Sequence, residues 1–161
     1  MTAGLVSRVL HEVADGSLGP LLRVTEDSLA PGAGYGRHAH RDVDVVAVVL
    51  AGGLTHAWSG GAELRAGDVG VLRAGTGLEH DEVAGPDGAL VVQTYLRAAA
   101  AGRPPAHEVR AAPSGWVDLD RDDARLWLGP AADAPGGVLV PAGPGRALVW
   151  QLDPARPSWA C

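Results

Sequence analysis

Two stretches decide the fold of this chain: Gly36-Arg37-His38-Ala39-His40-Arg41-Asp42-Val43-Asp44 and Gly77-Leu78-Glu79-His80-Asp81-Glu82. Side chains two positions apart on a β-strand point to the same face, so His38 and His40 project together, as do His80 and Glu82. If the two strands are neighbours in a small barrel, three imidazoles and one carboxylate converge on one point. That donor set suits a divalent transition metal. The competing interpretation is a surface His-x-His and a solvated turn, because short motifs often arise by chance.

Short apolar runs separated by turn residues cover the chain, and helical periodicity is almost absent. Loops such as Ala30-Pro-Gly-Ala-Gly and Ala74-Gly-Thr-Gly contain residues that favour tight turns. We therefore predict an all-β fold, a sandwich or barrel rather than alternating βαβ units. The predicted strands cover residues 5–10, 21–27, 35–40, 43–50, 54–58, 62–65, 69–73, 79–83 and 90–96.

The run Val45-Val46-Ala47-Val48-Val49-Leu50 is apolar on both faces instead of alternating. Such a strand needs cover on both sides. One face can fill the barrel, and the other must pack on the C-terminal region, on a partner subunit, or on both. The run therefore also predicts a homodimer.

Composition narrows the class of protein. The 161 residues are 47% hydrophobic and 20% charged, as in an ordinary globular domain. A net charge of −6 without a basic run argues against direct nucleic-acid binding. The single cysteine, Cys161, excludes an internal disulfide. Neither a membrane-spanning run nor a leader pattern is found, so we predict a cytoplasmic protein that does not bind a membrane.

The character of the chain changes after residue 97. Residues 98–110, rich in Ala and containing Pro104-Pro105, are predicted to be a linker that follows a barrel at 1–97. Residues 111–161 offer three further short strands, at 125–128, 137–140 and 146–152, and we expect this piece to pack on the barrel or on a partner. Its tryptophans are predicted to be buried anchors: Trp116, Trp127, Trp150 and Trp159.

Residues 17–97 closely resemble the first domain of the pirins, members of the cupin superfamily. The resemblance rests on the His38-x-His40 and His80-x-Glu82 blocks and on the turns around them, in their order and spacing. It implies a cupin-type double-stranded β-helix, or jelly roll, forming a small antiparallel barrel with a short C-terminal β extension. By match to the family motif, His38, His40, His80 and Glu82 are the metal ligands. The metal is usually iron, and Mn, Co, Ni, Cu or Zn would also fit this donor set.

The chain departs from the family pattern in its second half and at Asp44, whereas His56 fits the pattern. The second half resembles only the opening strands of the second pirin barrel. Asp44 stands where pirins and many cupins have Glu, and we interpret it as structural or as a support for a ligand histidine. His56 aligns with a common pirin histidine and is interpreted as a polar residue on a strand edge.

The resemblance implies a quercetinase-type dioxygenase that acts on a small planar substrate, a flavonol or related enol or phenol. Glu82 would be a ligand and also the base that takes the substrate's hydroxyl proton. Two alternatives come from other classes. One is a regulatory protein that senses redox state or metal through protein partners. The other is a metal-independent isomerase or cyclase on the same barrel, because one fold hosts many chemistries.

Overall fold

The computed structural model describes residues 3–13 and 15–153. Within them the chain forms twelve β-strands and one short 3-10 helix, so the all-β prediction is confirmed. No helix among the described residues is long and apolar enough to cross a membrane. The elements are β1 Leu5–Glu12, β2 Leu21–Leu29, β3 His38–His40, β4 Val43–Ala57, β5 Ala62–Arg65, β6 Val69–Arg73, β7 Leu78–Arg97, β8 Ala106–Arg110, β9 Gly115–Val117, β10 Ala124–Pro130, η1 Ala131–Asp133, β11 Val138–Pro141 and β12 Arg146–Leu152.

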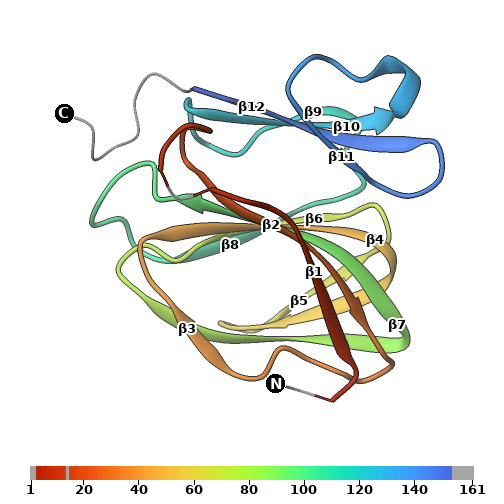
Figure 1. The fold of residues 1–161 in the computed structure, drawn as a ribbon. Helices are drawn as coiled ribbons and strands as arrows, with labels where there is room; N and C mark the ends of the chain where they lie inside the picture. Colours follow the sequence, from red (N-terminus) through yellow and green to blue (C-terminus); the bar gives the residue numbers. More distant parts are fainter. Residues whose placement is uncertain (1–2, 14, 154–161) are drawn as a thin grey trace.

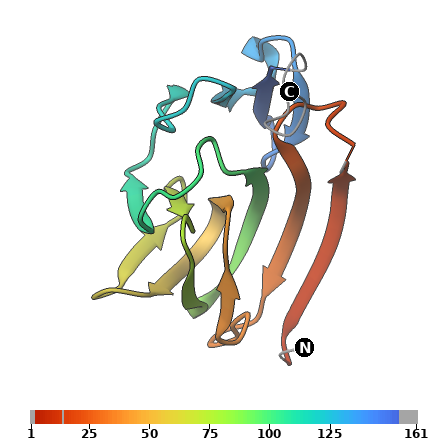
Figure 2. The same cartoon turned by 90° about the vertical axis from the view of Figure 1, so that its left-hand side faces the viewer.

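The strands form two antiparallel sheets (Figure 1). The larger has eight strands in the order β1-β2-β7-β4-β6-β8, with β3 paired to β7 and β5 paired to β4. It curves into a barrel, and the smaller sheet, β11-β12-β10-β9, lies across one end of it (Figure 2). Since β3 and β7 are neighbours, the two histidine-containing stretches lie side by side.

Two long bulged strands replace four shorter predicted ones. β4 spans the predicted strands 43–50 and 54–58, and β7 spans 79–83 and 90–96. Glycines favour turns, but the glycines between these predicted strands allow the two long strands to stay paired. A Cβ on Gly52, whose φ is +72°, would lie 2.0 Å from the carbonyl oxygen of Gly88. Glycine is required here by close backbone approach rather than by a chain reversal.

The predicted linker, residues 98–110, contains a strand. Residues 106–110 form β8, which pairs with β6 and extends the barrel sheet. β9 was also not predicted from the sequence. Both strands are short, so local alternation gives little sign of them.

Both faces of β4 are buried, as its sequence pattern requires. Ala47 and Val49 belong to the cluster inside the barrel, with Leu29, Leu54 and Val91. Val46 and Val48 belong to the second and larger cluster, which joins the barrel to the C-terminal sheet through Leu126, Leu128, Leu148 and Trp150. The outer face of β4 is therefore covered by this chain's own C-terminal sheet.

A homodimer remains a prediction, but its interface must lie elsewhere than on the outer face of β4. Val6 and Val9 on the edge strand β1 are 70% and 50% exposed. An edge strand with exposed apolar side chains is a suitable place for a second chain to pair. Sedimentation at micromolar concentration should give the mass of two chains, and a monomer alone would contradict the prediction.

The four tryptophans of residues 111–161 differ in their surroundings. Trp150 is buried, and its Nε1–H donates to Thr94 Oγ1 at 3.1 Å across the two sheets. Trp127 is half-buried. The prediction was wrong for Trp116, which is 41% exposed and lies against the Arg125 guanidinium at 3.8 Å from the ring centroid. Trp159 lies outside the described residues.

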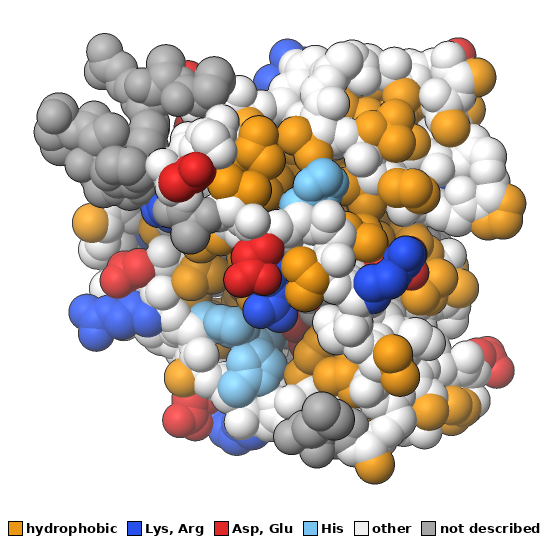
Figure 3. Space-filling view, in the orientation of Figure 1, with side chains coloured by type: hydrophobic (Ala, Val, Ile, Leu, Met, Phe, Trp, Pro, Cys, Tyr) orange, Lys and Arg blue, Asp and Glu red, His pale blue; other side chains and the backbone are white. Residues whose placement is uncertain are grey.

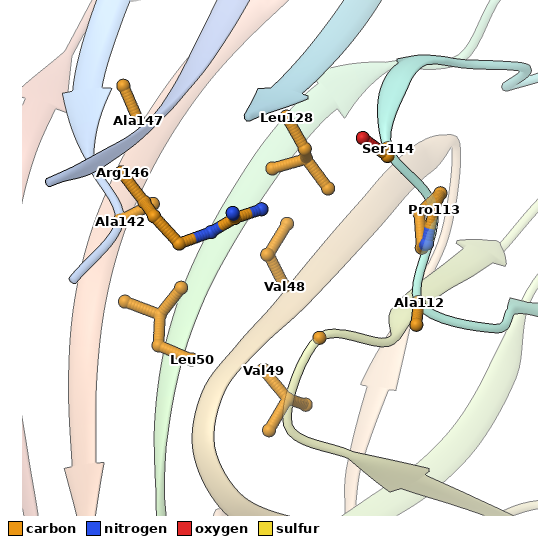
Figure 4. Close-up of a pocket in the computed structure, with 11 residues that line it drawn as sticks. Val48, Val49, Leu50, Ala112, Pro113, Ser114, Leu128, Ala142, Arg146 and Ala147 are labelled. Atoms are coloured by element: carbon orange, nitrogen blue, oxygen red, sulfur yellow. The ribbon is translucent and has the colours of Figure 1, made fainter. Parts of the chain in front are cut away.

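A cavity of about 310 Å³ lies between β4 and the C-terminal sheet. Figure 4 shows Val48 and Leu128 on its walls, with the Arg146 side chain reaching between them. Apart from that guanidinium and Ser114, the labelled walls are apolar. None of the four predicted ligands lines this cavity.

Candidate metal centre

Three imidazoles meet where β3 pairs with β7. His38 lies directly opposite His80 in the antiparallel register, and His40 lies opposite Leu78. Directly opposed residues share a face, so all three rings point the same way. Among the described residues, His38, His40 and His80 form a group whose ligand nitrogens all lie within 4.8 Å of one another.

The spacing of the three rings fits a metal ion. His38 Nε2 lies 2.9 Å from His40 Nε2 and 3.0 Å from His80 Nε2. Two nitrogens bound at about 2.1 Å and at right angles to one another would lie about 3.0 Å apart. His38 Nδ1–H donates to the Gly36 carbonyl oxygen at 2.6 Å, which leaves the Nε2 lone pair facing the centre. The donor set and its spacing therefore suit a transition-metal ion.

Two histidines of the centre, His40 and His80, favour the neutral form that binds metals. Burial, followed by the nearby His38, lowers the pKa of His80 to about 3. Burial also lowers the pKa of His40 from its ordinary value. Neutral imidazoles offer a lone pair near pH 7 without first releasing a proton. His80 is fully buried, whereas His38 and His40 are half-buried and leave one side of the centre open to a ligand.

Glu82 lies next to the three histidines but deeper in the barrel. Its Oε1 is 3.9 Å from His80 Nδ1, and it is not part of the group of three that lies within 4.8 Å. The Gln93 amide donates to both carboxylate oxygens at 3.4 Å. Burial raises the pKa of Glu82 to about 7. A carboxyl group with that pKa can both release and take up a proton near neutral pH.

His56 was wrongly interpreted as a strand-edge residue. It is buried on β4, directly opposite Glu82, and its Nε2 shares a hydrogen bond of 2.8 Å with His80 Nδ1. His107 on β8 stacks on it, with ring centroids 3.7 Å apart and planes 13° apart. Sequence reasoning missed His107 because no motif surrounds it.

Polar and aromatic side chains surround the three histidines. Tyr35 donates through its hydroxyl to Asp27 Oδ2 at 2.7 Å, and burial raises its pKa above its ordinary value. Tyr95 lies beside His40, with ring centroids 6.1 Å apart. Figure 3 shows histidine side chains at the surface near β3, in a face that also carries apolar and charged groups.

Asp44 has a structural partner rather than a histidine. Its Oδ2 accepts from Arg121 Nη1 at 2.9 Å, and Arg121 lies in the segment between β9 and β10. The structure thus favours the first of the two interpretations of Asp44, a structural role. Arg121 also binds Asp123 and the Arg97 carbonyl, so this cluster fastens the C-terminal sheet to the barrel.

Comparison with known proteins identifies a family for this chain. The sequence profile of the Pirin family matches residues 10–96, more than half of the chain. A Zymomonas mobilis protein named as a candidate quercetin 2,3-dioxygenase is 44% identical over 59 residues, 35% of this chain and 25% of the relative. The quercetin 2,3-dioxygenase of Escherichia coli K12 is 34% identical over 61 residues, 37% of this chain and 26% of the relative.

The likeness also extends to solved structures. The bacterial pirin YhhW of Escherichia coli, solved in complex with nickel(II), superimposes with a TM-score of 0.70 at 21% identity, over 94% of this chain and 84% of that one. The match confirms the cupin-type fold. The segments matched in the two named relatives span about a quarter of their length. By the extent of the profile match and by its fold, the chain belongs to the Pirin family.

Proposed function

We propose that this protein is a metal-dependent dioxygenase of the quercetinase type, acting on a flavonol or another small planar enol or phenol. The observation that carries the proposal is the convergence of three imidazoles beside a buried carboxyl group of raised pKa. The names of the matched relatives point the same way. A cytoplasmic location remains a prediction.

Each side chain of the centre has a proposed role. His38, His40 and His80 would hold one divalent ion, with Fe(II) as our first choice, and Glu82 would be the fourth ligand. The ion would supply Lewis acidity and a template for the substrate oxygens and dioxygen. Glu82 is also the proposed catalytic base, because a carboxylate beside the ion would be within reach of the hydroxyl proton of a bound enol or phenol.

The surroundings of the three histidines suit a planar substrate. His38 and His40 are half-buried, so one side of the centre can be reached from solvent. Tyr95, beside His40, offers an aromatic ring for an offset or edge contact. Burial raises the pKa of Tyr95 to about 12, so its phenol stays protonated and can donate a hydrogen bond.

Removal of His80 should abolish metal binding and oxygen consumption together. Protein purified without added metal or a chelating tag should carry about one equivalent of a transition metal, measured by elemental analysis. A His80→Ala variant should carry none, because it loses the buried member of the three-histidine group. Iron-loaded protein should consume dioxygen with a flavonol such as quercetin, and the variant should not.

His11 provides the matched control, since it lies on β1 outside the centre. A His11→Ala variant should keep both the metal and the activity. Failure of the wild-type protein to bind metal after anaerobic reconstitution would contradict the metal centre. Bound metal without oxygen uptake on any flavonol or enediol would contradict the dioxygenase.

A further inference from the structure

The Nδ1 side of the His80 ring makes a specific contact of its own. A metal-bound histidine usually donates its other N–H to a neighbouring group, which fixes the ring and its tautomer. In this chain the neighbour is another histidine: His56 Nε2 lies 2.8 Å from His80 Nδ1. Glu82, the nearest carboxylate, is farther from that nitrogen, at 3.9 Å. His56 is therefore the group that fixes the His80 ring.

His56 is in turn held on one face by His107. The two rings are nearly parallel, with centroids 3.7 Å apart. His107 reaches this position because β8 pairs with β6, which places it opposite Leu72. The space is provided by Gly70, where a Cβ would lie 3.2 Å from His107 Nε2 and 2.8 Å from a Leu64 methyl group. The positions of the two rings therefore depend on three strands, β4, β6 and β8.

We propose that His56 and His107 form a positioning pair for the metal ligand His80, in which His56 hydrogen-bonds the ring and His107 holds His56 by stacking. The inference rests on the proposed metal centre and deepens it. It gives a role to two residues that are not themselves metal ligands. One of them, His107, lies beyond the segment that matches the family profile, residues 10–96.

The contact has a consequence for where the protons sit. An ion on His80 Nε2 requires the ring proton on Nδ1, which then donates to His56 Nε2. The proton of neutral His56 must then sit on its own Nδ1. That nitrogen is buried and has no hydrogen-bond partner in the described part of the chain, so no protein group opposes this tautomer. The metal-loaded protein should carry both His80 and His56 as Nδ1–H tautomers.

Zinc affinity of His56 variants tests the hydrogen bond. We expect His56→Leu, which keeps bulk but has no polar atom, to bind Zn²⁺ about 10–100-fold more weakly than wild type in a competition titration. His56→Gln places an amide near the position of Nε2 and should recover most of the affinity. A purely structural role for His56 would lower stability in both variants without this difference in affinity.

Variants of His107 test the stacking. His107→Phe keeps a flat ring against His56 and should bind Zn²⁺ as wild type does. His107→Ala removes the ring and should weaken binding by several-fold, while the control His11→Ala leaves it unchanged. Equal affinity in His107→Ala and wild type would exclude His107 from the pair.

The outcomes separate the two proposals. If wild-type protein binds no Zn²⁺, the metal centre fails, and the positioning pair fails with it. If wild type binds and His56→Leu binds equally well, the positioning pair alone is overturned. Should His56→Leu not fold, ¹⁵N NMR of Zn²⁺-loaded wild type decides: protons on Nδ1 of both rings support the pair, and a His56 proton on Nε2 overturns it.

Discussion

Glu82→Gln should make the metal-free protein more stable by about 3 kcal/mol at pH 8, although it removes a proposed ligand. The buried carboxyl has a pKa of about 7 against an ordinary value of 4.5, and each unit corresponds to about 1.4 kcal/mol. At pH 8 the wild-type protein must keep a charge in a buried site, and the neutral amide avoids that cost. Urea unfolding of the two metal-free proteins measures the difference.

The sign of this effect depends on pH. Between about pH 4.5 and 7 the folded state holds the Glu82 proton and the unfolded state does not, so the free energy of unfolding falls as pH rises. Below pH 4.5 both states are protonated, and the two proteins should be equally stable. Above pH 7 the difference is complete. The lowered pKa values of His56 and His80 act in both proteins alike and cancel in the comparison.

The same substitution should weaken metal binding. We expect Glu82→Gln to lose more than about 100-fold in Zn²⁺ affinity, which is the upper end of the range for loss of a residue that only supports a ligand. Glu63→Gln, at an exposed position on β5, is the matched control and should alter neither property. If Glu82→Gln is no more stable than wild type at pH 8, other groups already stabilise the Glu82 charge in the metal-free protein.

Period-two spacing together with the pirin resemblance predicted the three-histidine group. His38, His40 and His80 are brought together by strand alternation and by one pairing, β3 with β7, so a local pattern contained most of the information. The pirin resemblance supplied the neighbouring strands. The sequence pattern also predicted that β4 needs cover on both faces: the barrel interior covers one, and the C-terminal sheet covers the other.

The remainder of the site depends on register, which local patterns determine weakly. His56 reaches His80 only because two register shifts in the pairing of β4 with β7 set it opposite Glu82. His107 reaches His56 only through β8, a strand inside the predicted linker. Asp44 and Arg121 are 77 residues apart and meet only when the C-terminal sheet docks. Such contacts leave no periodic trace in the sequence.

Arg121→Met should destabilise the protein by about 3–5 kcal/mol, because it leaves the buried Asp44 carboxylate without its cation. The Arg121 side chain is 1% exposed and makes ion pairs with Asp44 at 2.9 Å and Asp123 at 2.6 Å. Asp44 Oδ1 already has no hydrogen-bond partner among the described residues. Urea unfolding at pH 7 of the variant and wild type measures the loss.

A second substitution shows whether the loss comes from Asp44. In the double variant Arg121→Met with Asp44→Asn, the buried charge is gone, so much of the lost stability should return. Burial already raises the pKa of Asp44, against the pull of Arg121. Without Arg121 that pKa should rise further, so the deficit of Arg121→Met should shrink as pH falls and Asp44 takes up a proton in the folded state. A deficit that stayed constant from pH 7 to pH 5 and was not relieved by Asp44→Asn would place the loss in the contacts with Asp123 and the Arg97 carbonyl.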